Sequence, residues 1–335
     1  MHASEDIPGA TRRAATGGKV LIALLVLIIA CALAAGPAFL TAYWLRILSN
    51  VFMYAVLAQG VNIIAGYTGY PAFGNVVFFG LSGYFTAVLM VKVQAPFLVG
   101  LLAGACLCPL LALAVGPPLL RLKGHYFAIA TLGLNEAVKE LVSNGTRLTG
   151  GGMGISLPLP PWGPAANAMF FYYLFFGTML LSVWVTWEFS RRRIGLACTA
   201  IRDNEIKAEA MGIYCTRCKT TAWAISAFLT GLVGSINAYW MTYIDPPAVF
   251  DMAIAVKSFV IFLLGGPATV FGPVIAAFFV ELLATLTWSK LLNWHVGALG
   301  MIIMLVVLLF PAGFRPAWRR VPALLAQLKS LRVRT

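Results

Sequence analysis

Long apolar runs separated by short polar loops form most of this chain and determine its predicted architecture. A helix needs about 20 predominantly apolar residues to cross a bilayer. We expect spans at about residues 20–40, 43–65, 73–91, 97–120, 126–142, 168–189, 220–241, 253–264, 274–288 and 295–310, of which the eighth is short. The pattern therefore predicts an all-α polytopic membrane protein with about ten transmembrane helices, in a single domain over residues 1–335.

The first apolar run follows a polar segment, residues 1–19, that carries Arg12, Arg13 and Lys19. A run preceded by basic residues can be a signal peptide, and Ala32-Leu33-Ala34 resembles a small-residue cleavage site. Because apolar sequence continues through Leu40, we favour an uncleaved first helix with a cytosolic N-terminus.

Two segments rich in glycine and proline interrupt the apolar pattern, residues 65–75 (AGYTGYPAFGN) and 264–273 (LGGPATVFGP). Irregular backbone at membrane depth is tolerated only where protein buries it or it lines a water-filled cavity. The glycines expected to break the helices are Gly66, Gly69, Gly74, Gly265, Gly266 and Gly272. The uncharged polar residues Asn62, Thr68 and Asn75 surround the first interruption, and we expect them to line a translocation path. The two interruptions share too few residues to establish an internal repeat.

Composition and charge support the membrane assignment. Hydrophobic residues make up 61% of the chain and charged residues only 10%, against about a quarter charged in soluble domains. The formal net charge of +13 comes from basic residues in loops and at the termini, as the positive-inside rule produces. Nucleic-acid binding is therefore a poor interpretation. The same rule places residues 1–19, 191–219 and the basic tail 311–335 in the cytosol, and the loops 143–167 and 243–251 outside.

The longest strongly charged stretch inside the chain is residues 191–219. Its central part, Ile201 to Met211, has the pattern of one short amphipathic helix. Asp203 and Lys207 stand at the i,i+4 spacing that supports such a helix, and Gly212 follows where a C-cap glycine is expected. A solvated connector does not need a helix of mixed charge, so we favour a cytosolic docking element over a plain loop.

The cysteines predict neither a disulfide framework nor a metal centre. Cys31, Cys106 and Cys108 lie in apolar runs, where they act as small hydrophobic residues. Cys215 and Cys218 form a CxxC motif with Cys198 upstream, but no fourth zinc ligand lies nearby in sequence. We expect free cytosolic thiols and no bound metal.

Ionisable residues inside the apolar runs are costly and need an explanation. Glu136 in the fifth run has two open interpretations: a place at a subunit interface or the path, or an ion-paired cluster with Lys139 and Glu140 near a helix end. For Glu281 in the ninth run we favour an interhelical hydrogen bond. An ion-coupled secondary transporter would use one of these acids as its ion site.

Five segments, in order along residues 43 to 310, resemble the Liv-type permeases of ABC importers for branched-chain amino acids and related solutes. They are AIRDNEIKAEAMGI (200–213) with the span that follows it, GYTGYPAFGNVVFFGLSGY (66–84), YFAIATLGLNEAVKE (126–140), TGGGMGI (149–155) and GGPATVFGP (265–273). The fold implied is that of a type II-like importer permease. Two departures, Asn75 where many members have His and Pro71-Ala72-Phe73 instead of a polar run, put the solute in doubt more than the fold.

The resemblance implies an inner-membrane permease that works with a second, paralogous permease subunit, two cytosolic ABC ATPases and an extracytoplasmic binding protein. Its coupling residues would be Arg202, Asp203, Glu205, Lys207, Glu209, Ala210 and Gly212. The chain has no phosphate-binding Gly-x-x-x-x-Gly-Lys-[Ser/Thr] loop, so it is not expected to be an enzyme, and ATP and magnesium would bind the partners. Branched-chain amino acids are the default solute; urea, amides and small aromatic acids are alternatives.

Overall fold

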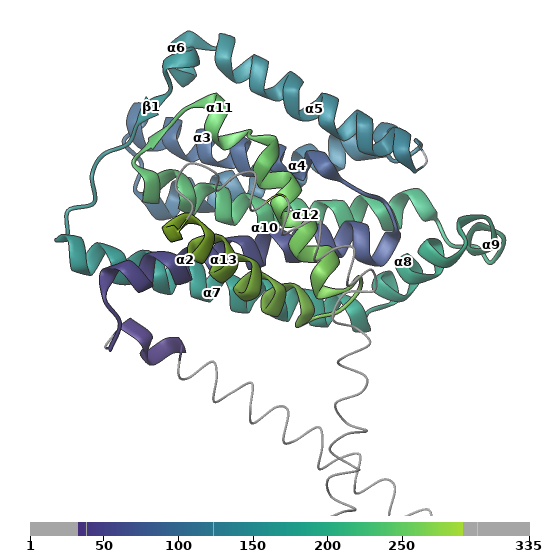
Figure 1. The fold of residues 1–335 in the computed structure, drawn as a ribbon. Helices are drawn as coiled ribbons and strands as arrows, with labels where there is room; N and C mark the ends of the chain where they lie inside the picture. The colour runs from purple at the N-terminus through teal and green to yellow at the C-terminus, as the bar shows by residue number, and fades with distance from the viewer. Residues whose placement is uncertain (1–32, 38, 123, 291–299, 301–335) are drawn as a thin grey trace, which may run out of the picture.

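A computed structural model describes residues 33–37, 39–122, 124–290 and 300. Within these residues the chain is a bundle of helices (Figure 1). The long helices are α2 (Ala42–Val61), α3 (Val76–Lys92), α4 (Phe97–Leu119), α5 (His125–Asn144), α7 (Pro164–Arg191), α10 (Cys215–Met241), α12 (Met252–Gly265) and α13 (Gly272–Lys290). Shorter helices are the π-helix Asn62–Gly66, the 3-10 helices Phe73–Asn75 and Gly151–Met153, α6 (Thr146–Thr149), α8 (Arg193–Asp203), α9 (Glu205–Ala210) and α11 (Pro246–Val249). The all-α polytopic class is therefore confirmed.

Six of the described helices are long and apolar enough to cross a membrane: Ala42–Gly66, Phe73–Lys92, Phe97–Leu119, Pro164–Arg191, Cys215–Met241 and Pro246–Gly265. The fifth predicted span forms α5, but its three charged residues make it more polar than these six. The ninth is shorter, with its apolar part at Gly272–Thr285. The tenth predicted span and most of the first lie outside the described residues, so the count of ten stays a prediction.

The segment before the second interruption differs from its prediction. We expected a short apolar run at 253–264 after a loop at 243–251. Instead α11 begins at Pro246 and leads into α12, and together they form a span of 20 residues. Proline is tolerated at the start of a helix, where its missing N–H would have no helical partner. Asp251 caps α12 by accepting a hydrogen bond from the backbone N–H of Ala253 at 2.9 Å.

Helix α10 lies at the centre of the bundle, packed against α3, α4 and α2. In the most apolar 18-residue stretch of α10, 83% of the residues are buried, compared with 33% in α4. More of the surface of α4 is therefore available to contact lipid. Small residues allow this packing. A side chain at Gly234 would meet the carbonyl oxygen of Phe79 on α3, and one at Gly231 would meet Cys108 on α4. Backbones of membrane helices approach closely where such small residues face one another.

The two ends of the bundle carry different loops (Figure 1). At one end, strand β1 (Ile155–Ser156) pairs antiparallel with β2 (Tyr243–Ile244), with Ile155 opposite Ile244. This pairing joins the two loops that the charge pattern places together, 143–167 and 243–251, so the first of them is not structureless. The helices α8 and α9 project from the other end (Figure 1).

Candidate functional site

The charged segment at the end of the bundle forms two helices, not the single helix predicted over 201–211. Helix α8 ends at Asp203, Asn204 has extended backbone (φ −164°, ψ 108°), and α9 begins at Glu205. The side-chain oxygen of Asn204 accepts a hydrogen bond from the backbone N–H of Lys207 at 3.0 Å. Asparagine is a favoured N-cap because its side chain satisfies a free helix donor, and this cap stabilises the break. The predicted Asp203–Lys207 spacing therefore straddles two helices, and Asp203 lies 3.6 Å from Arg202.

The C-terminus of α9 matches its prediction. Gly212 has a φ of +84°, a left-handed conformation that glycine adopts at low cost. Its N–H bonds the carbonyl of Glu209 at 2.9 Å, and the N–H of Ile213 bonds that of Ala208 at 3.1 Å. These are the two hydrogen bonds of a Schellman motif, which satisfies the last carbonyls of the helix.

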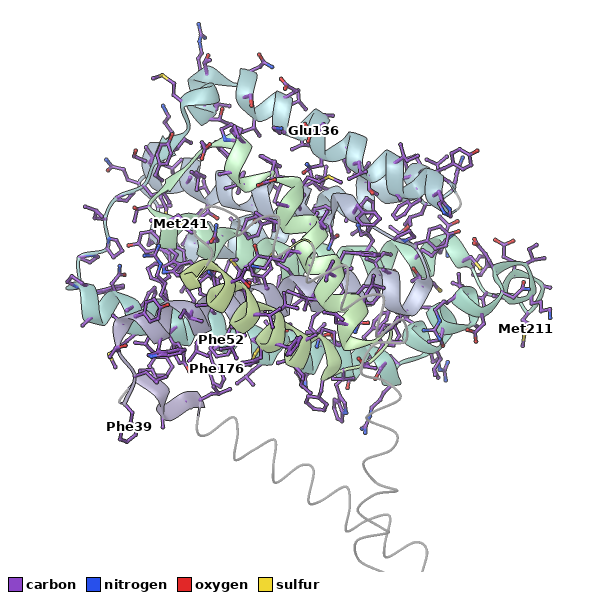
Figure 2. All side chains as sticks on the ribbon, viewed as in Figure 1. Phe39, Phe52, Glu136, Phe176, Met211 and Met241 are labelled. Carbon is purple, nitrogen blue, oxygen red and sulfur yellow. The ribbon has the colours of Figure 1, made fainter. Side chains whose placement is uncertain are left out.

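Much of α9 faces away from the protein. Ala208 packs in a small cluster with Ile201 and Cys215, while Lys207, Glu209 and Ala210 are exposed. Two apolar side chains are exposed beside them, Ile206 at 73% and Met211 at 83%. Met211 lies at the α9 end of the bundle in Figure 2. The tip of α9 therefore presents apolar side chains beside charges of both signs.

A buried lysine joins this segment to the bundle. Lys219, near the start of α10, is only 2% exposed. Its ammonium group donates to Glu205 Oε1 at 2.7 Å, to the hydroxyl of Tyr70 at 3.0 Å and to the carbonyl of Leu120 at 3.1 Å. The Tyr70 hydroxyl in turn donates to Glu205 Oε2 at 2.5 Å. Burial, and then the hydrogen bond to Glu205, raise the pKa of Tyr70 above its usual range, so this hydroxyl remains a donor.

A second contact ties α8 to the first interruption. Arg202 donates from Nη1 to the carbonyl of Gly66 at 2.8 Å. Gly69 has a φ of +78°, and a side chain there would lie 3.0 Å from Arg202 Cγ. A π-helix, Asn62–Gly66, leads into the interruption. Just beyond it, the hydroxyl of Thr68 donates a hydrogen bond to the carbonyl of Ile64 at 2.6 Å. The expectation of broken helix is therefore confirmed here.

The two interruptions, distant in sequence, lie close together at Gly66 and Ala268, and Asn62, in the π-helical turn that leads into the first, holds the second. Its Oδ1 accepts from the backbone N–H of Ala268 at 2.9 Å, and its Nδ2 donates to the carbonyl of Thr269 at 2.7 Å. Gln59 adds a hydrogen bond from Nε2 to the carbonyl of Val270 at 2.5 Å. The side-chain amide of Asn62 is thus engaged with backbone on both of its atoms. Its path role stays a prediction, and its observed contacts hold the second interruption.

The glycines of the second interruption allow two stretches of backbone to approach each other closely. A side chain at Gly265 would meet the backbone of Gly272 and Pro273, and one at Gly272 would meet the carbonyl of Gly265. Gly266 has a φ of +90° and ends α12. The chain thus reverses between α12 and α13 across a contact that needs glycine on both sides.

The predicted path residues occupy different surroundings. Asn75 is buried and donates from Nδ2 to Ser226 Oγ at 2.9 Å and Thr230 Oγ1 at 3.2 Å, both on α10, while its Oδ1 has no hydrogen-bond partner. Glu136 lies apart on α5 (Figure 2), more than half exposed, and pairs with Lys139 at 3.1 Å. Both interpretations of Glu136 remain open, because an exposed ion pair on a membrane helix also suits a protein interface or water.

Glu281 forms an ion pair with Lys257 across α13 and α12, with Oε1 2.5 Å from Nζ. The lysine ammonium also lies 4.0 Å from the ring centre of Tyr54 on α2. The interhelical partner expected for Glu281 is therefore present, as an ion pair with a residue that sequence reasoning did not single out.

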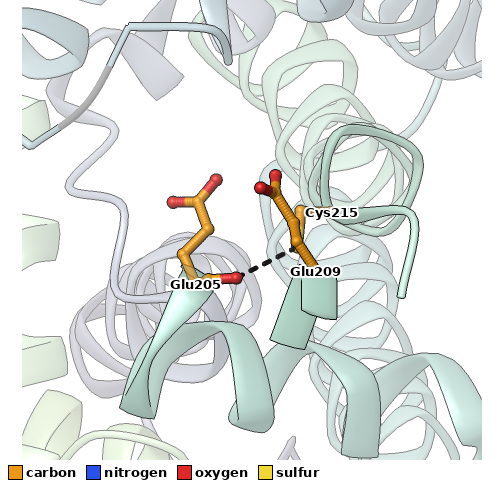
Figure 3. A group of neighbouring side chains, drawn as sticks. All are labelled: Glu205, Glu209 and Cys215. Atoms are coloured by element: carbon orange, nitrogen blue, oxygen red, sulfur yellow. Dashed lines mark hydrogen bonds between the residues drawn. The ribbon is translucent and has the colours of Figure 1, made fainter. Parts of the chain in front are cut away.

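The carboxylates of Glu205 and Glu209 approach the Cys215 thiol, with ligand atoms within 4.8 Å of one another (Figure 3). The sequence pattern did not predict that these three groups lie together. Glu205 is already engaged by Lys219 and Tyr70, so a metal would compete with a buried cation. Among the described residues Cys106, Cys108, Cys198, Cys215 and Cys218 are free thiols. The absence of a metal stays a prediction.

Sequence reasoning missed Gln59 and Tyr70 altogether and counted Lys219 only as a charge. No local pattern separates Lys219 from Arg217, which stands two residues before it at the start of α10. No local pattern marks Gln59, whose partner lies more than two hundred residues away.

The bundle, its interrupted helices and the exposed helical segment at one end define the membrane-spanning subunit of a transporter. The family model described as "Branched-chain amino acid transport system / permease component" matches residues 43–311, and the chain belongs to this family. It is 28% identical to the "High-affinity branched-chain amino acid transport system permease protein LivM" of Escherichia coli (strain K12), over 89% of this chain and 75% of the relative. The LivM protein of Salmonella typhimurium (strain LT2) matches at the same identity and coverage. No solved structure matches the chain.

The chain is therefore the permease subunit of an ABC importer, a multi-pass protein of the inner membrane. Its family acts as one component of a larger transport system, which sets aside an ion-coupled secondary transporter. The family match is to the permease component of a transport system, and that the chain itself is not an enzyme stays a prediction.

Proposed function

We propose that α9, with the end of α8, docks into a cytosolic ABC ATPase and couples its cycle to the membrane bundle. The observation that carries this proposal is the exposed tip of α9, where Ile206 and Met211 project among Lys207 and Glu209. The helix is held firmly at both ends, by the Asn204 cap and by the Gly212 turn. A short rigid helix with such a surface can transmit a displacement, whereas a loose loop would absorb it.

The matching test replaces the docking surface and asks whether the complex still holds its ATPases. Glu209→Arg combined with Gly212→Leu reverses one charge and strains the left-handed turn, so we expect ATPase subunits to be lost on co-purification and uptake to fall with them. Glu140→Arg, the same reversal at an exposed site on α5, is the control and should retain them. Intact retention and uptake in the double variant would disprove the docking role.

The full assembly would contain a second, paralogous permease subunit, two ATPases and an extracytoplasmic binding protein. Support comes from the relatives, whose names describe a permease protein of a transport system. In this arrangement α8, α9 and both termini of the chain lie on the cytosolic side. The paired loops at β1 and β2 face outward toward the binding protein, in accord with the distribution of basic residues.

For the solute we propose a branched-chain amino acid, with urea, amides or small aromatic acids as alternatives. The support is the family description and the LivM relatives. Calorimetric titration of the partner binding protein with leucine, isoleucine and valine tests this assignment. Binding of urea, an amide or an aromatic acid, with no response to the three amino acids, would overturn it.

A further inference from the structure

The most unusual contact at the α9 end of the bundle is the ion pair between Lys219 and Glu205. Lys219 is 2% exposed and its three hydrogen-bond acceptors come from three parts of the chain: α9, the first interruption and the end of α4. Its ammonium also lies 4.2 Å from the ring centre of Tyr70. A salt bridge whose only purpose is to orient a loop in the cytosol does not need to be buried, since surface pairs are cheaper to form.

Two separate contacts therefore fasten the α8–α9 segment to the first interruption. Glu205 of α9 receives the hydroxyl of Tyr70, and Arg202 of α8 donates to the carbonyl of Gly66. Tyr70 and Gly66 lie on either side of Gly69, which has a positive φ. A displacement of α9 cannot leave this stretch in place without breaking one of these bonds.

Side chains just before and within the first interruption reach the second interruption and α10. Asn62 and Gln59 hold the backbone of residues 268–270 in the second interruption. Asn75 holds the hydroxyls of Ser226 and Thr230 on the central helix α10. The contacts are thus continuous from α9 to both interruptions and to the core of the bundle.

We propose that Lys219, Glu205 and Tyr70, together with Arg202 on Gly66, form a relay that makes the two interruptions follow the movement of α9. Lys219 acts as a positioning residue, because it holds α9, the first interruption and α4 in one arrangement. The proposal rests on the docking function above. It adds that the interruptions move as a pair, since Asn62 joins them, and that Lys219 determines whether they respond to the ATPase.

The central variant is Lys219→Met, which keeps the length of the side chain and removes its charge. The matched control is Lys92→Met, the same substitution at an exposed lysine at the end of α3. Each variant is purified as the full complex with its partner subunits, and uptake of radiolabelled leucine is measured per assembled complex. We expect Lys219→Met to retain the ATPases and to lower uptake about fivefold or more, in the range of typical coupling between sites. The control should match the wild type.

Hydrogen–deuterium exchange provides the readout that a merely structural role would not change. Peptides covering residues 61–76 are compared with ADP and with ATP plus vanadate. In the wild type we expect nucleotide to change their exchange, and in Lys219→Met we expect that difference to disappear while the ATPases remain bound. Tyr70→Phe removes only one hydroxyl and serves where Lys219→Met does not assemble, with a smaller loss in the same direction.

A double-mutant cycle that combines Lys219→Met with Glu205→Gln tests whether these two residues act together in uptake. If Lys219 and Glu205 act together, the double variant loses no more uptake than either single variant, because groups in one network are not additive. Additive losses would overturn the relay. So would wild-type uptake and exchange in both Lys219→Met and Tyr70→Phe, or loss of the ATPases from both. A wild-type complex without ATPases would instead refute the docking proposal.

Discussion

Single glycines of the first interruption determine how closely neighbouring backbones can approach. A side chain at Gly74 would lie 1.8 Å from the carbonyl oxygen of Thr131 on α5, where the Gly74 N–H also bonds the Thr131 hydroxyl at 3.2 Å. At Gly66 a side chain would meet Asn62 Oδ1 and the Ala268 N–H, the two atoms that join the interruptions. These positions therefore accept no other residue without a shift of backbone.

We predict that Gly74→Ala destabilises the protein by about 1–3 kcal/mol, the usual cost of forcing extra atoms into a packed site. Thermal unfolding of the purified protein in detergent measures the loss. Gly133→Ala on α5 is the control, because a side chain there meets nothing within 4 Å. Equal melting temperatures for the two variants would contradict the contact with Thr131.

The Cys198 thiol should be unreactive in the folded protein. It is fully buried against α10, where its Sγ lies 3.7 Å from the carbonyl of Cys218, and burial raises its pKa to about 12. Because the thiolate is the reactive species, iodoacetamide at pH 8 should leave Cys198 unlabelled until the protein is denatured. Mass spectrometry before and after denaturation checks this, and rapid labelling of the folded protein would contradict it.

At the scale of elements, the sequence predicted most of the described helical spans, both glycine-rich interruptions and the Gly212 turn, because each has a local pattern. It did not predict the break at Asn204, since an asparagine within a helical pattern becomes a cap only when the segments on either side pack in different directions. It also could not show that the two interruptions meet. The side chains of Asn62 and Gln59 make that contact with backbone atoms of residues 268–270. Every residue has these backbone atoms, so the sequence does not indicate which ones will be bound.

The contact between the interruptions gives a prediction for Asn62. Replacing it with leucine leaves the N–H of Ala268 and the carbonyl of Thr269, both part-buried, without their side-chain partner, and an unsatisfied group costs at most about 1–3 kcal/mol. We expect Asn62→Leu to lower the melting temperature and to increase hydrogen exchange of residues 266–271. Asn144→Leu, at the exposed end of α5, should do neither. Unchanged exchange at 266–271 would show that other contacts hold the second interruption.

At the scale of the whole molecule, charge is concentrated at one end and neutralised inside. Two lysines are paired with acids: Lys257 with Glu281, and Lys219 with Glu205. An isolated charge in a membrane would cost about 2.5–3.5 kcal/mol on insertion scales. The side chains that Asn75 contacts on α10, Ser226 and Thr230, are uncharged.

Asn75 joins the first interruption to the central helix, and its Oδ1 has no hydrogen-bond partner among the described residues. A path role predicts that Asn75→Leu lowers uptake severalfold per assembled complex, because it removes this acceptor and releases two hydroxyls of α10, yet leaves assembly intact. The control is Ser49→Ala, which removes a buried hydroxyl bonded to its own helix, at the carbonyl of Leu45. Uptake of labelled leucine and recovery of all subunits are measured together. Wild-type uptake in a fully assembled Asn75→Leu complex would remove Asn75 from the path.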